Sequence, residues 1–417
     1  MPRQYIPALS HRNFRLLWIG LLISMSGSLM QNAAILWHVS LLASPGRKAL
    51  ALGLVGLVRV APIVFFSMLS GVVADVWNRR KLMLMTQGAA TVVAVILTIL
   101  TYQGLTRIWP IYVLAALGAS AGAFDLPARA ALIPMLVPRK DLPNAISLNS
   151  IMFQAASVIG PSIGGIVIGE AGLTWVYALN AISFLFVIGA LLAMRNVPDR
   201  LDGDKTRRNE ISWQAAMEGL RFVFRSPLIR STMILDFLAT FFASANTLLP
   251  IFAQDILRVG ARGYGWLYAA PAAGAVITSA AMIPLNERMR HRGLVLLYGI
   301  SIYGFANVVF GFSRSFWLSF ACLAVTGSAD TVSTIIRNVI RQLETPDHMR
   351  GRMTGVNMIF FMGGPQLGEL EAGLVANWFG AAFSVVLGGV CCLAATGWIW
   401  SKTPALRHYD RDRSEVS

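Results

Sequence analysis

Long apolar runs alternate with short polar loops along almost the whole chain. A helix needs about 20 apolar residues to cross the hydrocarbon core of a bilayer, and twelve runs are long enough. These predicted spans lie at residues 14–43, 49–73, 81–103, 108–136, 142–169, 173–194, 227–256, 263–286, 293–312, 316–343, 351–377 and 380–401. The pattern predicts an all-α integral membrane protein with twelve transmembrane helices.

The longest polar stretch, residues 196–212, divides these spans into six and six. The two sets repeat with a shift of 208 residues, so that spans four and five correspond to spans ten and eleven. The matched pairs are Arg129 and Arg337, Pro138 and Pro346, Asn149 and Asn357, Ile151 and Ile359, Phe153 and Phe361, Gly160 and Gly368, Gly165 and Gly373, and Val167 and Val375. We therefore predict two six-helix pseudo-repeat halves, 1–195 and 226–401, a linker at 196–225 and a tail at 402–417.

The end of the linker has a helical stripe of large apolar residues. Trp213, Met217, Leu220 and Phe224 recur at helical spacing, which is typical of a helix lying on a membrane surface. The alternative is that these residues form the first turns of span seven.

Composition supports membrane insertion and sets the orientation. Of the 417 residues 56% are hydrophobic and 13% are charged, whereas soluble domains average about 25% charged residues. The net charge of +15 would suit nucleic acid, but 28 of the 35 basic residues fall in loops and termini on one side of the predicted membrane and six on the other. We therefore expect no nucleic-acid partner and place both termini in the cytoplasm.

The sequence lacks the short motifs of the common enzyme classes that act in or at membranes. It contains no HExxH and no GxxxxGK[ST], and no GxSxG and no Cys/His pair lies at a predicted membrane face. Its three cysteines lie inside predicted spans and have no metal-ligand spacing. We expect no enzyme activity, no metal, no cofactor and no direct use of ATP. An intramembrane enzyme or a membrane sensor is the alternative from another class, although a sensor would normally carry an added soluble domain.

The segment GVVADVWNRR, residues 71–80, joins spans two and three. It has Gly71, then Asp75 four residues later, then the basic pair Arg79 and Arg80. This pattern resembles the loop between the second and third helices of the major facilitator superfamily of transporters. The family motif has glycine where this chain has Asn78, a residue that tolerates a left-handed backbone better than most.

That resemblance implies a substrate site between the two halves near the middle of the membrane. It also implies a latch, in which Asp75 packs against the start of span eleven near Arg350 and Arg352, with Arg129 as a second partner. Gly71, Arg79 and Arg80 belong to the same gating motif.

Four further stretches are similar to the enterobactin-exporter-like branch of that superfamily, which includes related drug exporters. They are FDLPARAALIP from Phe124, GLRFVFRSPLI from Gly219, GWLYAAPAAGA from Gly265 and ETPDHMRGRMTGV from Glu344. The resemblance implies a monomer in the bacterial inner membrane that exports a small amphipathic molecule in exchange for protons. Import of a solute by the same fold is the alternative.

Span five contains GPSIGG, which resembles the antiporter motif of drug–proton exchangers. Gly160 and Gly164 form a small face for close helix contact, Pro161 can bend the helix, and Gly165 completes the motif. The alternative is ordinary helix packing.

Ionisable side chains inside spans are costly and seldom face lipid. Among them, Asp236 and Asp330 lie on spans seven and ten, which the family fold places around the central cavity, so both are candidates for proton coupling or substrate binding. Asp125 on span four is the next candidate, and Arg129, four residues later, can neutralise it.

Arg59 and Glu369 lie at nearly the same depth in spans two and eleven. The family fold places these spans side by side, so we predict a bridge between the two charges that opposes the Asp75 latch. The alternative is that each charge bonds to amides within its own half.

Overall fold

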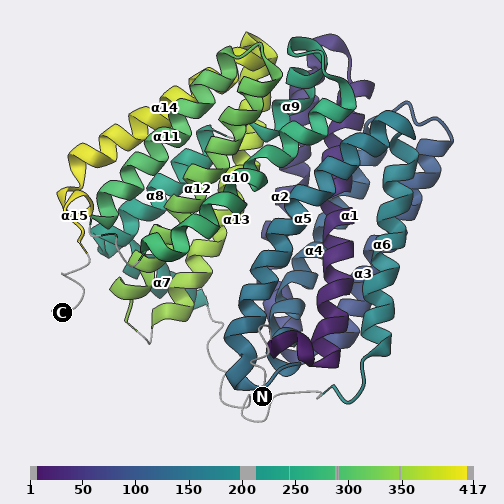
Figure 1. Cartoon of the computed structure of the whole chain (residues 1–417), viewed down its shortest axis with the longest axis horizontal. Coiled ribbons are helices and arrows are strands. Elements are labelled where there is room, and N and C mark those ends of the chain that lie inside the picture. The colour runs from purple at the N-terminus through teal and green to yellow at the C-terminus, as the bar shows by residue number, and fades with distance from the viewer. Residues whose placement is uncertain are drawn as a thin grey trace. The chain divides into compact units, whose positions relative to one another are not determined.

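The computed structural model describes residues 7–197, 213–243, 245–286, 289, 291–346 and 349–410. Across these ranges the chain is helical and has no strand, which agrees with the all-α prediction (Figure 1). The long helices are α1 (Arg12–Leu42), α2 (Lys48–Val76), α3 (Arg79–Tyr102), α4 (Trp109–Leu132), α5 (Leu142–Glu170), α6 (Leu173–Ala193), α7 (Trp213–Arg225), α8 (Pro227–Phe242), α10 (Gly260–Asn286), α11 (Arg292–Phe312), α12 (Phe316–Glu344), α13 (Arg350–Phe379) and α14 (Ala381–Lys402).

Ten stretches of the described chain are long and apolar enough to cross a membrane. The protein is therefore a multi-pass membrane protein. The ten do not include α10 and α13, although these helices have 27 and 30 residues. Helix α13 carries Glu369 and Glu371, which lower its mean hydropathy. The count of twelve spans stays a prediction.

The chain forms two compact units. Unit 1 contains residues 1–43, 58–208 and 260–269, and unit 2 contains residues 44–57, 209–259 and 270–417. Unit 1 contains most of the first six predicted spans and unit 2 most of the last six, with two exchanges. The N-terminal end of α2 groups with unit 2, and the N-terminal end of α10 groups with unit 1.

In unit 1, α1 packs against α5 and α6, and α3 packs against α4 and α6 (Figure 1). One end of the unit has a core of buried side chains from these helices, including Phe14, Leu82, Leu132 and Leu148. Small residues set the α1–α5 contact, because a Cβ at Gly160 would meet the backbone oxygen of Ser26. The first two glycines of GPSIGG therefore pack α5 onto α1.

In unit 2, α11 packs against α12 and α14, and α13 packs against α8, α14 and α7. Helix α7 ends before Ser226, whose hydroxyl accepts a hydrogen bond from the backbone N–H of Ile229 and caps α8. A separate helix ahead of span seven is thus confirmed, and its position on the membrane surface stays a prediction. Its packed side is formed by the buried Val223 with Leu220, whereas Phe224 is 46% exposed.

Predicted span seven is interrupted. Helix α8 ends at Phe242, and a 3-10 turn (Asn246–Leu248), a short α9 (Leu249–Ile251) and a π-helical turn (Phe252–Ile256) continue the segment. Pro250 has no backbone N–H to continue the helical ladder, which favours a break four residues earlier. The hydroxyl of Tyr303 on α11 donates to the carbonyl of Ala243 at 3.1 Å, so the break has a partner outside its own segment.

Candidate functional site

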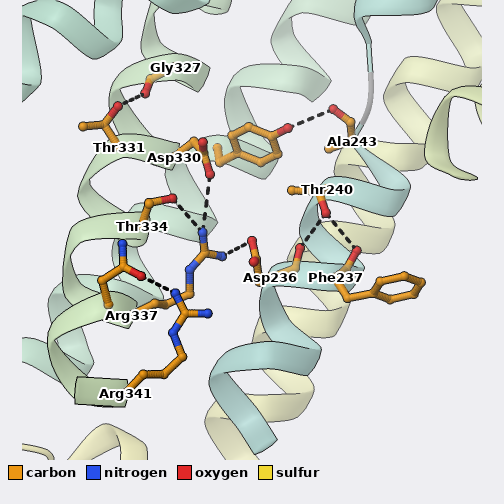
Figure 2. Close-up of polar contacts among 12 residues, drawn as sticks. Asp236, Phe237, Thr240, Ala243, Gly327, Asp330, Thr331, Thr334, Arg337 and Arg341 are labelled. Atoms are coloured by element: carbon orange, nitrogen blue, oxygen red, sulfur yellow. Dashed lines mark hydrogen bonds and ion pairs between the residues drawn. The ribbon is translucent and has the colours of Figure 1, made fainter. Parts of the chain in front are cut away.

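Three charged side chains meet inside unit 2. An Arg337 Nη1 hydrogen bond reaches the carboxylate of Asp236, and Arg337 Nη2 lies 3.7 Å from Oδ1 of Asp330. Figure 2 shows the guanidinium between Asp236 on α8 and Asp330 on its own helix, α12. Both carboxylates that the sequence offered as candidates thus lie next to one arginine, and their roles stay predictions.

Helical spacing explains the arrangement on α12. Asp330 and Arg337 are seven residues apart, so they lie two turns apart on one face of the helix. Thr334 lies between them, and its Oγ1 accepts from Arg337 Nη2 at 2.8 Å.

The two carboxylates differ in how far their side chains are exposed. The side chains of Arg337 and Asp236 are only 3% and 6% exposed, whereas that of Asp330 is 50% exposed. A buried guanidinium requires an opposite charge nearby, since removing one member of a buried pair leaves an uncompensated charge. Asp236 supplies that charge to Arg337 by direct contact.

The position of Arg337 corrects one part of the sequence analysis. Arg337 and Arg341 were counted with the loop arginines that set the orientation, but both are buried in α12, and Arg341 hydrogen-bonds Asn338. The seven-residue spacing between Asp330 and Arg337 is the sequence signal that could have indicated that Arg337 belongs to this site. Removing these two arginines from the loop count leaves the charge bias on the same side.

Asp125 takes partners from another helix. Its Oδ1 accepts from Thr86 Oγ1 at 2.9 Å and from Gln87 Nε2 at 2.8 Å, both on α3. Among the described residues it forms no ion pair with Arg129. The structure thus brings Asp125 to a polar contact within unit 1.

The gating motif is described in part. Arg80 donates to the carbonyls of Leu191 and Leu192 at 2.8 and 3.3 Å, near the end of α6. Asn78 has a negative φ of −61° and caps α3 by accepting from Lys81 N, so no left-handed backbone is needed here. The buried Arg79 follows it.

The proposed latch lies outside the described side chains. These do not include Asp75 or the start of α13 at Arg350 and Arg352, and Gly71 lies in the same undescribed stretch. The Asp75 latch and the role of Arg129 in it stay predictions.

Arg59 donates through Nη2 to Oδ1 of Asn32 on α1 at 3.2 Å, a contact to an amide within unit 1. A contact of Arg59 to an amide in its own half was the alternative to the Arg59–Glu369 bridge. The bridge itself stays a prediction.

At two places a pair of facing glycines lets two helices cross with their backbones in close contact; we call these the two glycine crossings. In unit 2, a Cβ on Gly373 of α13 would lie 2.6 Å from the Cα of Gly53 on α2, and a Cβ on Gly56 would lie 2.8 Å from the Cβ of Glu369. In unit 1, a Cβ on Gly165 of α5 would lie 2.7 Å from the Cα of Gly265 on α10. Gly165 and Gly373 are matched positions of the internal repeat, so the crossings are equivalent.

An ion pair lies near each crossing. Arg262 pairs with Glu170 in unit 1. In unit 2, Lys48 Nζ lies 3.0 Å from Asp255 and donates to Gln254 at 2.6 Å. These pairs attach the N-terminal end of α10 to α5, and the N-terminal end of α2 to the π-helical turn.

Comparison with known proteins identifies the family. The model of the transmembrane secretion effector family matches residues 4–416. The chain belongs to this family of major facilitator transporters. The family consists of transporters, so the enzyme class considered from the sequence does not apply.

Individual relatives agree with this assignment. The chain is 28% identical to the enterobactin exporter of Escherichia coli O1:K1 over 69% of its own length and 68% of that protein. The enterobactin exporter of Shigella boydii serotype 18 has the same identity and coverage. The resemblance to the enterobactin-exporter-like branch is thereby confirmed.

Solved structures support the fold alone. A bacterial homologue of the human lysosomal transporter Spinster aligns with a TM-score of 0.73 at 14% identity, covering 96% of this chain and 99% of that one. The nucleoside transporter NupG aligns with a TM-score of 0.68 at 15% identity, covering 94% of this chain and 98% of that one.

Proposed function

We propose that this protein is a secondary transporter that exports a small, amphipathic, siderophore-like organic molecule in exchange for protons. It works as a monomer with twelve membrane spans and both termini in the cytoplasm of a bacterial cell. It needs no bound cofactor or metal, because the proton gradient supplies the energy, and it binds no nucleic acid.

The substrate class rests on the relatives. Proteins that cover two thirds of the chain carry the name enterobactin exporter, and the family is one of secretion effectors. An aromatic surface next to Asp236 suits a substrate with rings. Phe237 stacks on Phe241 with ring centroids 5.6 Å apart and meets Phe360 edge-on at 6.0 Å.

Proton coupling rests on the Arg337 cluster. Ionisable groups inside membrane spans are rare, and they mark ion paths and proton relays. Two carboxylates around one arginine give this transporter a group that can change its charge without leaving that arginine unpaired.

The span count and the orientation rest on helix length and charge. Helices α10 and α13 have 27 and 30 residues, or about 40 and 45 Å at 1.5 Å per residue, which exceeds the roughly 30 Å hydrocarbon core. With the ten other candidate spans they make twelve. An even number of spans places both termini on the side with the excess of arginine and lysine.

Transport by the purified protein in proteoliposomes tests this function. With an imposed pH gradient, we expect movement of enterobactin, or of one member of a panel of amphipathic compounds, against its own gradient and opposite to the proton flow. Collapse of the pH gradient with a protonophore should stop accumulation. Transport that is unchanged by the protonophore would rule out proton coupling, and no transport of any compound would refute the substrate class.

Neutralising Asp75 should slow this transport. The expected partner is the N-terminus of α13 with Arg350 and Arg352, where an acid is favoured by the helix dipole by roughly 1 kcal/mol. Loss of that contact predicts an Asp75→Asn transporter that is about fivefold slower but still folded, as measured by initial rates and thermal unfolding. The control is Lys140→Gln, which removes an exposed loop charge and should leave the rate unchanged. A folded Asp75→Asn protein with the wild-type rate would contradict the latch.

A further inference from the structure

The Arg337 cluster contains two carboxylates that play different parts. Asp236 is 6% exposed and in direct contact with Nη1 of Arg337, whereas Asp330 is 50% exposed and lies 3.7 Å from Nη2. The first is a buried member of an ion pair. The second is more exposed and has a looser contact with the same arginine (Figure 2).

From this difference we infer that Asp330 is the carboxylate that takes up and releases the transported proton, and that Asp236 stays ionised as the fixed partner of Arg337. The inference rests on the proposed proton-coupled function and names the residue that carries the coupling. Proton uptake forms one O–H bond on the Asp330 carboxylate, and release breaks that bond, so the side chain alternates between neutral acid and carboxylate.

Charge balance supports this division. When Asp330 is protonated, Arg337 keeps its direct bond to Asp236 and never becomes a buried charge without a partner. If Asp236 were the group to be protonated, the guanidinium would keep only the half-exposed carboxylate at 3.7 Å. The first arrangement avoids the large cost of an uncompensated buried charge.

Thr334 links the two states. Its Oγ1 accepts from Arg337 Nη2 at 2.8 Å, and the same nitrogen lies 3.7 Å from Asp330 Oδ1. Thr334 therefore holds the part of the guanidinium that faces Asp330. Thr334 is thus a positioning residue, through which Arg337 responds to the charge of Asp330.

The other groups around Asp330 come from three helices. Arg337 and Arg341 lie on its own helix, Asp236 on α8, and Tyr303 on α11. Residues 270–286 of α10, which also pack on α12, include no titratable side chain. Of the two carboxylates in this cluster, Asp330 is the more exposed.

Rates of enterobactin transport measured across a pH range, with the full-length protein in proteoliposomes, separate the two roles. Asp330→Asn should lose about tenfold or more of the stimulation by the pH gradient and give a flat pH profile, while exchange of labelled for unlabelled enterobactin without a gradient continues. Asp236→Asn should keep a pH-dependent profile and move it about 1 pH unit or more to the acid side, because Asp330 becomes the sole counter-ion of Arg337.

Thr334 variants keep the test decisive if Asp236→Asn does not fold. Thr334→Val removes the hydroxyl at nearly constant volume and leaves Arg337 Nη2 without this acceptor, so it should shift the profile, whereas Thr334→Ser should restore it. Asp255→Asn, a carboxylate outside this cluster, is the control and should keep the wild-type pH dependence.

The inference would be overturned by a wild-type pH profile in Asp330→Asn. A flat profile in Asp236→Asn beside a normal one in Asp330→Asn would also overturn it, as would a Thr334→Val profile at the wild-type position. A wild-type protein that transports without any response to the pH gradient would instead refute the proposed proton coupling.

Discussion

Alanine at Gly373 or at Gly165 is expected to reduce transport by about tenfold or more while the protein still inserts into the membrane. At each position the new Cβ would lie within 2.7 Å of the Cα of the facing glycine, Gly53 or Gly265. That atom belongs to a backbone and cannot move aside as a flexible side chain can. Overpacking of this kind typically costs about 1–3 kcal/mol, which corresponds to a change of roughly fivefold to 140-fold in an equilibrium. In the alanine variants the two helices would have to move apart, so the protein could no longer adopt conformations in which these helices are in close contact.

Two other glycines provide the control. Gly189 on α6 and Gly397 on α14 have open space where a Cβ would be added. Alanine there should keep transport and raise stability by up to about 1 kcal/mol, because alanine favours the helix. The measurements are initial transport rates in proteoliposomes and thermal unfolding of the purified protein. Wild-type transport by Gly373→Ala and Gly165→Ala would show that neither crossing takes part in the transport cycle.

Much of the fold was predictable because membrane spans depend on local composition. Apolar runs of about 20 residues located the helices, and the 208-residue repeat paired Gly165 with Gly373, which the structure places at equivalent crossings. The small residues of GPSIGG also predicted a close helix contact. The partners of these glycines were not predictable, since Gly53 and Gly265 contact them across long sequence separations that only the tertiary fold sets.

The same reasoning explains what the sequence analysis missed. Arg337 lies within two turns of the end of α12, and a charge near a helix end is more often in a loop or at the membrane surface. Its burial depends on Asp236, which is 101 residues away in the chain. Pro250 is a local sequence signal for the interruption of span seven. The span was predicted from its mean hydropathy, which does not change at a break in the helix. The exchange of the α2 and α10 ends between the units has no local signal.

Removal of Arg337 is expected to have the largest effect on stability. Arg337→Ala would leave the carboxylate of Asp236, 6% exposed, without its cation. Breaking a buried pair from one side typically costs about 3–5 kcal/mol, a large fraction of the stability of most proteins. We expect a protein that unfolds at clearly lower temperature in detergent and does not transport. Arg314→Ala, at an exposed arginine, is the matched control and should change the stability by no more than about 0.5 kcal/mol.

A double variant separates the charge from the packing. Asp236→Leu with Arg337→Met removes both members of the pair and fills the space with apolar atoms, a change that is often neutral or stabilising when a buried ion pair is replaced. If the pair stabilises the protein only by mutual neutralisation, the double variant should recover most of the lost stability, and the coupling between the two positions should exceed about 2 kcal/mol. It should still lack proton-driven transport, because Asp330 then has no arginine to respond to its charge. Recovery of both stability and proton coupling would show that the buried pair is dispensable and that the coupling site lies elsewhere, with Asp125 as the next carboxylate to test.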